Sequence, residues 1–177
     1  LPLEMMGAPG SPYTRKMRAV LQYRRIPFVF IQQNSAEAAK KPGAKVPLLP
    51  TFYLPNDNGE TVPATDSTPL IRRFEGAFKG RSVIPSDPAL AFLDERLEDY
   101  ADEWLTKCMF HYRWYHEADA TKARRILPHW AMKEVSDDEI APVQKMIGDR
   151  QIGRLGVVGS NDVTAEVIEE SYRRFLS

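Results

Sequence analysis

Short segments typical of β-strands alternate with turn residues in the first part of the chain. These segments lie at residues 3–6, 28–31, 46–49, 51–54 and 60–63. Most of them are rich in apolar, β-branched and aromatic side chains, which favour the pleated and half-buried surface of a sheet. Asn58 followed by Gly59 is a β-hairpin signal, because both residues tolerate the positive φ angles of a tight turn. The segments on either side of this pair are therefore expected to run antiparallel.

Two helix starts complete this part of the chain. Ser11 before Pro12 combines a favoured N-cap residue with proline in the first helical turn, and Asp66 opens a similar Asp-Ser-Thr-Pro start. The first helix has an apolar stripe that includes Met17 and Leu21. Its charged residues are assigned to the solvent-exposed face: Arg15, Lys16, Arg18 and Arg24. The predicted order is strand, helix, strand, hairpin and a second helix.

The pattern becomes helical after residue 88. A stretch rich in proline and polar residues separates the two parts, and we expect domains at 1–80 and 88–177 with a linker at 81–87. Apolar residues then recur every three or four positions, which predicts one long helix to about residue 115. The residues of this stripe are Leu90, Leu93, Leu97, Tyr100, Trp104 and Cys108. Further helices are expected at 118–135 with an interruption at Pro128, at 138–147, and at 164–177.

Composition narrows the function classes. The chain has 177 residues and a formal net charge of zero, so no overall basic field favours nucleic acid or an anionic membrane as a partner. No apolar run is long enough for a membrane span. Cys108 is the single cysteine, which excludes an intramolecular disulfide, a Cys-x-x-Cys redox pair and a thiolate zinc cluster. A reducing compartment is expected, with the cytoplasm as the default.

Three motifs in order resemble those of the cytosolic glutathione S-transferases. They are Ser11–Pro12–Tyr13, the Lys-Val-Pro-Leu-Leu stretch that begins at Lys45, and the Asp-Ser-Thr-Pro-Leu-Ile stretch that begins at Asp66. The likeness is to serine-type members of the tau, omega or zeta kind. It implies an α/β thioredoxin-like N-terminal domain followed by an all-α C-terminal domain. The resemblance also implies a C-terminal domain some tens of residues longer than 88–177, so this domain is interpreted as abbreviated or cut short.

The resemblance assigns roles to residues of the first domain. Ser11 is the candidate donor to the thiolate of glutathione, with Tyr13 as the alternative and simple helix capping as the structural explanation. Val46 would pair with the peptide backbone beside a cis Pro47, with a trans proline at a strand edge as the alternative. Lys45 would pair with the glycine carboxylate, with an ordinary solvated lysine as the alternative. Asp66 and Ser67 would hold the γ-glutamyl end; both also suit a helix cap.

Assignments in the second domain are less specific. By resemblance, His111, Trp114 and Tyr115 line the pocket of a second substrate, with core packing as the alternative. The spacing of the three histidines with acidic partners indicates no metal site, so His111, His116 and His129 are interpreted as surface or capped histidines. Cys108 falls on an apolar stripe and is expected to be buried.

The implied activity is conjugation of glutathione, as cosubstrate, to a small hydrophobic electrophile in a detoxification reaction, without a metal. A homodimer is the habit of the family. The alternatives are a non-catalytic interaction module of the same fold, and a glutathione-dependent isomerase, dehalogenase or reductase. A reductase of the omega kind needs cysteine where this chain has Ser11, because a mixed disulfide must form there.

Overall fold

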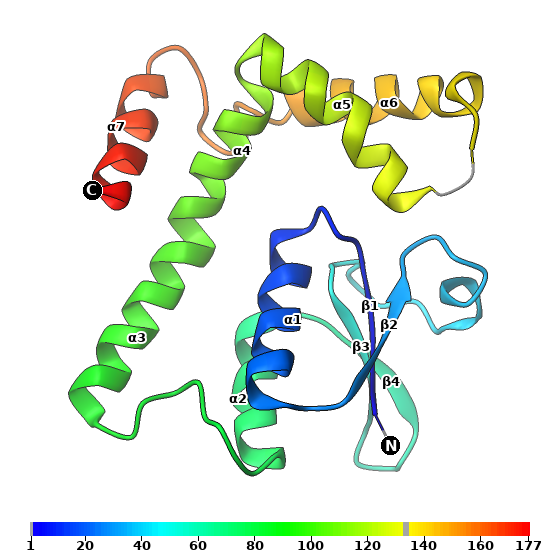
Figure 1. The fold of residues 1–177 in the computed structure, drawn as a ribbon, viewed down its shortest axis with the longest axis vertical. Helices are drawn as coiled ribbons and strands as arrows, with labels where there is room; N and C mark the ends of the chain where they lie inside the picture. The colour runs from blue at the N-terminus through cyan, green and yellow to red at the C-terminus, as the bar shows by residue number, and fades with distance from the viewer. Residues whose placement is uncertain (1, 133–134) are drawn as a thin grey trace. The chain divides into compact units, whose positions relative to one another are not determined.

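The computed structural model describes residues 2–132 and 135–177 (Figure 1). The chain forms two compact units that divide between Ser86 and Asp87. Each unit has its own secondary structure, mixed in the first and helical in the second. The predicted fold class, a thioredoxin-like α/β sheet followed by a helical region, is confirmed.

The first unit is built on a four-stranded sheet in the order β2-β1-β3-β4. The strands are β1 (Leu3–Gly7), β2 (Phe28–Gln32), β3 (Thr51–Pro55) and β4 (Thr61–Ala64). β1 is parallel to β2 and antiparallel to β3, and β3 is antiparallel to β4. The predicted hairpin is confirmed, and Gly59 adopts the positive φ of 79° that its turn requires. A short 3₁₀ turn, Ala38–Lys40, lies between β2 and β3.

Two helices cover one face of this sheet (Figure 1). α1 (Pro12–Arg24) crosses between the parallel strands, and α2 (Ser67–Ala77) follows β4. One continuous core joins both helices to the sheet, and its largest contributions come from Met5, Met17, Leu21, Phe52, Leu70 and Phe74. Residues directly opposite each other on paired strands point to the same face of the sheet, so Met5 and its cross-strand partner Phe52 both join the core under the helices.

The strand predicted at residues 46–49 is wrong. This segment forms bends, and the Leu48 N–H donates to the Val46 carbonyl at 2.9 Å in a tight turn. Pro47 and Pro50 have no N–H to donate to a sheet ladder, so pairing can begin only at Thr51.

Arg24 is also placed differently from its predicted exposed position. It is buried at the end of α1, where Nε donates to the Arg81 carbonyl at 2.9 Å and Nη2 to the Phe78 carbonyl at 2.8 Å. Its Nη1 lies 3.2 Å from Glu75 Oε1, as an ion pair whose geometry is not a hydrogen bond. The side chain thus joins α1 to α2 and to the segment that follows α2.

The second unit starts with the predicted long helix, but a π-helical turn divides this helix into two α-helical parts. α3 (Pro88–Tyr100) continues through a π-helical turn (Ala101–Leu105) into α4 (Thr106–Trp114). A π-turn contains one residue more than an α-turn, which rotates the two halves of the helix relative to each other by about 100°.

The predicted apolar stripe is not one buried face, because α3 has no buried residue. Leu90 and Leu97 on α3 are 56% and 65% exposed, whereas Cys108 on α4 is fully buried. The burial of Cys108 confirms the prediction for that residue. Burial raises the pKa of its thiol above the ordinary value.

The remaining helices are α5 (Glu117–Ala131), α6 (Asp137–Ile152) and α7 (Ala165–Leu176). α5 and α6 lie side by side, and α7 packs on α4 (Figure 1). Pro128 does not interrupt α5, and residues 133–134 of the predicted 118–135 helix lie outside the described residues. α6 begins with a capping box between Ser136 and Glu139. Among the described residues, no helix has both the length and the apolar character needed to cross a membrane.

Candidate functional site

Three connections of the first unit meet at one edge of the sheet. β1 ends at Gly7 and leads into α1. Thr51 pairs with Met6 in antiparallel register, so the residues just before Thr51 reach the edge where β1 ends. Ala64 at the end of β4 pairs with Phe52, which brings the start of α2 to the same edge.

The connection from β1 to α1 is tightly packed. A Cβ added at Gly7 would lie 2.6 Å from Thr14 Cγ2, so only glycine allows this approach. Thr14 is fully buried, and its Oγ1 accepts a hydrogen bond from the Ala8 N–H at 3.4 Å. These contacts fix the first turn of α1 against the end of β1.

Ser11 is the N-cap of α1, as predicted. Its backbone is extended, and its Oγ accepts from the Thr14 N–H at 3.2 Å. Capping uses the hydroxyl as an acceptor, so this contact leaves the O–H proton for another partner. The alternative candidate, Tyr13, lies half-buried in the first turn of α1.

Asp66 and Ser67 begin α2 at the same edge. Asp66 has φ 78° and ψ 119°, a backbone conformation that costs a non-glycine residue about 1–3 kcal/mol. Its Oδ1 accepts from the Thr68 N–H at 3.3 Å, which confirms a capping role. Ser67 is buried, and its Oγ accepts a hydrogen bond from Lys16 Nζ at 3.1 Å.

Lys16 is predicted from the sequence pattern only as part of the exposed face of α1. The contact with Ser67 brings its positive charge to the start of α2, so it is a candidate site residue that sequence reasoning missed. No local pattern in the sequence identifies its partner, which lies 51 residues away.

The predicted cis proline is at the wrong position. The peptide bond between Leu49 and Pro50 is cis, whereas the resemblance predicts a cis bond before Pro47. Pro50 is buried and directly precedes β3, and Lys45, Val46 and Pro47 lie earlier in the loop, where the Val46 side chain is exposed. The start of the strand at Thr51 is the sequence signal that could have identified the cis proline, because Pro50 immediately precedes that strand.

A comparison with protein families agrees with this geometry. The family model described as the N-terminal domain of glutathione S-transferase matches residues 5–82. The first unit is a glutathione S-transferase N-terminal domain. The predicted family is thereby confirmed through this domain. No curated protein matches the sequence.

Solved glutathione transferases resemble the chain at low identity. A Methylobacterium radiotolerans enzyme in complex with glutathione sulfonate is 18% identical over 86% of this chain, with a TM-score of 0.49. The chain spans 63% of the length of that protein. A tau-class transferase from mango is 15% identical, covering 86% of this chain and 79% of its own, with a TM-score of 0.49. A Burkholderia homologue with bound glutathione is 11% identical, covering 98% and 100% of the two chains, with a TM-score of 0.48.

The residues predicted for a second substrate lie in the second unit. His111 and Trp114 are buried, and Tyr115 stacks on the His111 ring with centroids 4.5 Å apart. The cavities described in this unit are not lined by these three residues. Their positions suit the alternative of core packing, and a substrate-binding role stays a prediction.

Of the two predicted alternatives for the histidines, a surface position is wrong for His111, which is fully buried and has a hydrogen-bond partner on each ring nitrogen. His111 Nε2 and His116 Nε2 lie 3.4 and 3.3 Å from the same oxygen, Glu169 Oε1. Sequence spacing alone does not indicate this cluster, because its carboxylate comes from α7, 58 residues beyond His111.

Proposed function

We propose that the N-terminal domain binds glutathione and that the chain transfers its thiolate to a small hydrophobic electrophile. The observation that carries this proposal is the meeting of Ser11 with the Asp66–Ser67 pair at one sheet edge, in a domain of this family. Each of these groups matches a different part of the tripeptide, so the chemistry of the edge can be compared with glutathione group by group.

The start of α2 suits the γ-glutamyl end. The Asp66 carboxylate would accept from the ammonium group, and the Ser67 hydroxyl with the first N–H groups of α2 would bind the carboxylate. Lys16 Nζ, which donates to Ser67 Oγ at 3.1 Å, adds a positive charge for that carboxylate. The positive φ of Asp66 supports the proposal, since strained backbone conformations are concentrated at functional sites.

The segment before β3 suits the peptide backbone. The register of β3 on β1 brings Leu49 to the end of β1, where its main-chain groups can pair with an extended peptide. We therefore propose Leu49 for the role that the sequence suggests for Val46 and Pro47. Lys45 stays a candidate for the glycine carboxylate, because it is an exposed positive charge in the loop before β3.

Ser11 would stabilise the thiolate. A cysteine thiol with a pKa of about 8.5 is mostly protonated near neutral pH, and lowering that pKa by about two units takes about 2.7 kcal/mol. A hydroxyl donor together with the positive end of a helix supplies an interaction of this size. Ser11 offers both, since it caps α1 as an acceptor and keeps its O–H proton for sulfur.

The test separates the thiolate role of Ser11 from its capping role. Ser11→Ala removes the cap and the donor, Ser11→Asp keeps a good cap but removes the hydroxyl, and Ser11→Thr keeps both. We expect Ser11→Ala and Ser11→Asp to lower conjugation of chlorodinitrobenzene on the order of 100-fold and to raise the pKa of bound glutathione. Ser11→Thr should retain most of the activity.

Ser136→Ala is the matched control, because it removes a serine helix cap in the second unit. It should leave turnover and the glutathione pKa unchanged. Unchanged values in Ser11→Ala would remove Ser11 from the mechanism and direct attention to Tyr13. Calorimetry that detects no glutathione binding to the wild type at millimolar concentration would refute the proposed function as a whole.

A further inference from the structure

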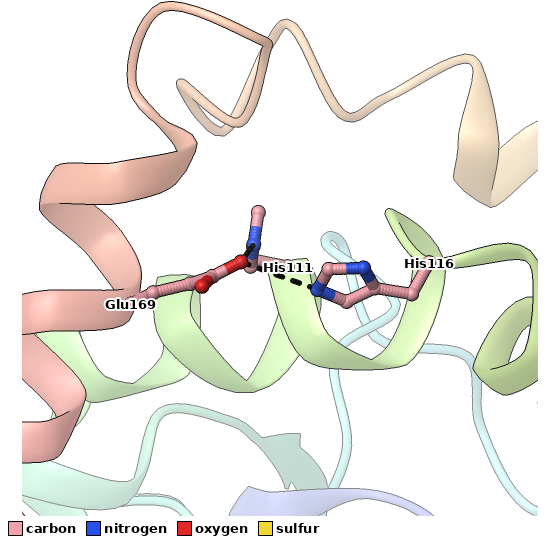
Figure 2. A group of neighbouring side chains, drawn as sticks. All are labelled: His111, His116 and Glu169. Atoms are coloured by element: carbon pink, nitrogen blue, oxygen red, sulfur yellow. Dashed lines mark hydrogen bonds and ion pairs between the residues drawn. The ribbon is translucent and has the colours of Figure 1, made fainter.

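Two histidines and a glutamate converge inside the second unit, and none of them is among the residues assigned to glutathione (Figure 2). His111 lies on α4, His116 lies in the turn between α4 and α5, and Glu169 lies on α7. One ring nitrogen of each histidine and a carboxylate oxygen of Glu169 all lie within 4.8 Å of one another.

We propose that His111, His116 and Glu169 bind one divalent metal ion, with zinc as the ion that their ligand atoms and spacing fit. Imidazole nitrogen and carboxylate oxygen are the ligands of three-residue zinc sites that keep a further position for water or another ligand. Two ligand atoms, each about 2.0–2.1 Å from a tetrahedral zinc ion, lie about 3.3 Å apart. The observed separations from Glu169 Oε1 are 3.4 Å to His111 Nε2 and 3.3 Å to His116 Nε2.

Two contacts hold the His111 ring in an orientation suited to metal binding. Its Nδ1 lies 2.8 Å from Ser160 Oγ, and its face stacks on Tyr115. When Nδ1–H donates to Ser160, the neutral ring presents the Nε2 lone pair to the ion. Metal-binding histidines commonly have such a partner on the second nitrogen, because it fixes the tautomer and the ring orientation.

The cluster is open on one side. The side chains of His116 and Glu169 are 41% and 27% exposed, whereas His111 is fully buried. An ion can therefore reach the buried nitrogen from solvent past the other two ligands. Once bound, it would connect α7 to α4 and to the start of α5, and so stabilise the folded second unit by mass action.

A metal-free explanation exists for the same geometry. If Ser160 donates to Nδ1 instead, His111 carries its proton on Nε2 and donates it to Glu169, and His116 can do the same. The two explanations differ in one measurable property, since only the first predicts saturable binding of a metal ion.

The experiment is a calorimetric titration of the full, untagged chain with zinc chloride, in buffer free of glutathione and chelators. We expect one ion per chain. His116→Gln and Glu169→Gln should each weaken binding by more than about 100-fold, and Ser160→Ala, which removes only the partner of His111, by about 10-fold. Co(II) substitution should give visible absorption bands typical of tetrahedral nitrogen and oxygen coordination in the wild type, and these bands should be lost in His116→Gln and Glu169→Gln.

His129→Gln is the matched control, because His129 is an exposed histidine on α5 outside the cluster. It should bind zinc like the wild type. The proposal is overturned if the wild type shows no saturable binding, or if both His116→Gln and Glu169→Gln retain wild-type affinity. Melting curves without metal check that the variants fold, and the exposed position of His116 makes its variant the more conservative of the two.

Discussion

Arg24 offers a sharp test of how the first unit is held together. Replacing it with alanine removes two hydrogen bonds to main-chain carbonyls, those of Phe78 and Arg81, and an ion pair with Glu75. All three partners belong to α2 or to the segment that follows it. The substitution therefore separates the end of α1 from that segment without changing the sheet.

The expected loss follows from the burial of the partners. Removing one member of a buried ion pair costs about 3–5 kcal/mol, because the other charge is left uncompensated. Glu75 keeps two further donors, Ser82 Oγ at 2.7 Å and the Val83 N–H at 3.1 Å, so its carboxylate is not left bare. We therefore expect Arg24→Ala to lower the free energy of unfolding of the first unit by about 3 kcal/mol, the low end of that range.

Hydrogen exchange measured by mass spectrometry is the suitable assay. All three tryptophans lie in the second unit, so intrinsic tryptophan fluorescence does not report on the first. Peptides from β1, β2 and α1 should exchange on the order of 100-fold faster in Arg24→Ala. Arg24→Lys, which keeps the charge but not the planar fork of donors, should give a smaller increase.

Arg73→Ala is the matched control on α2. Arg73 is exposed and donates to one carbonyl, that of Pro55, at 3.0 Å. Its removal should cost less than about 1 kcal/mol. If Arg24→Ala has no larger effect than Arg73→Ala, the assigned role of the buried guanidinium is refuted.

Three further predictions concern other parts of the chain. Gly7→Ala should lower stability in urea titrations by about 1–3 kcal/mol, because the new Cβ would lie 2.6 Å from a buried side chain of α1; Gly43→Ala, where nothing lies within 4 Å, should have little effect, and equal midpoints would contradict this. Cys108 should react with a thiol reagent far more slowly in the native chain than in urea, since burial blocks access and raises its pKa; comparable rates would count against it. Hydrogen bonds from Ser136 lower the pKa of Glu139, so this carboxylate stabilises the fold above its ordinary pKa and the contribution is lost as the pH falls through the lowered value. Ser136→Ala should therefore lower the melting temperature more at neutral pH than in acid, and identical losses would disprove the linkage.

Local signals in the sequence are sufficient for most of the secondary structure. Ser11 and Asp66 cap helices through contacts with residues two or three positions away, so their roles can be predicted from neighbouring residues. The hairpin at Asn58–Gly59 can likewise be predicted from neighbouring residues, because its turn depends on these residues themselves. The order of elements in the first unit follows from such signals, and the resemblance to a family supplies the way they assemble.

Contacts between distant residues explain what the sequence does not predict. Arg24 resembles a surface residue in the sequence, because its partners on and after α2 lie more than 50 positions away. The cluster of His111 and Glu169 spans a similar distance and leaves no pattern along the chain. The cis bond is expected before Pro47 rather than Pro50 because two prolines lie close together and only the start of β3 distinguishes them.

The π-helical turn at Ala101–Leu105 rotates the side chains of α3 about the helix axis relative to those of α4. Deleting one residue there would restore a continuous α-helix and turn the α3 side chains by about 100° about the helix axis. The buried face of α4, with Cys108 and His111, would stay in place, because its packing is set by α5, α6 and α7. A change in length at this point would thus redirect the largely exposed side chains of α3 without rebuilding the core beyond it.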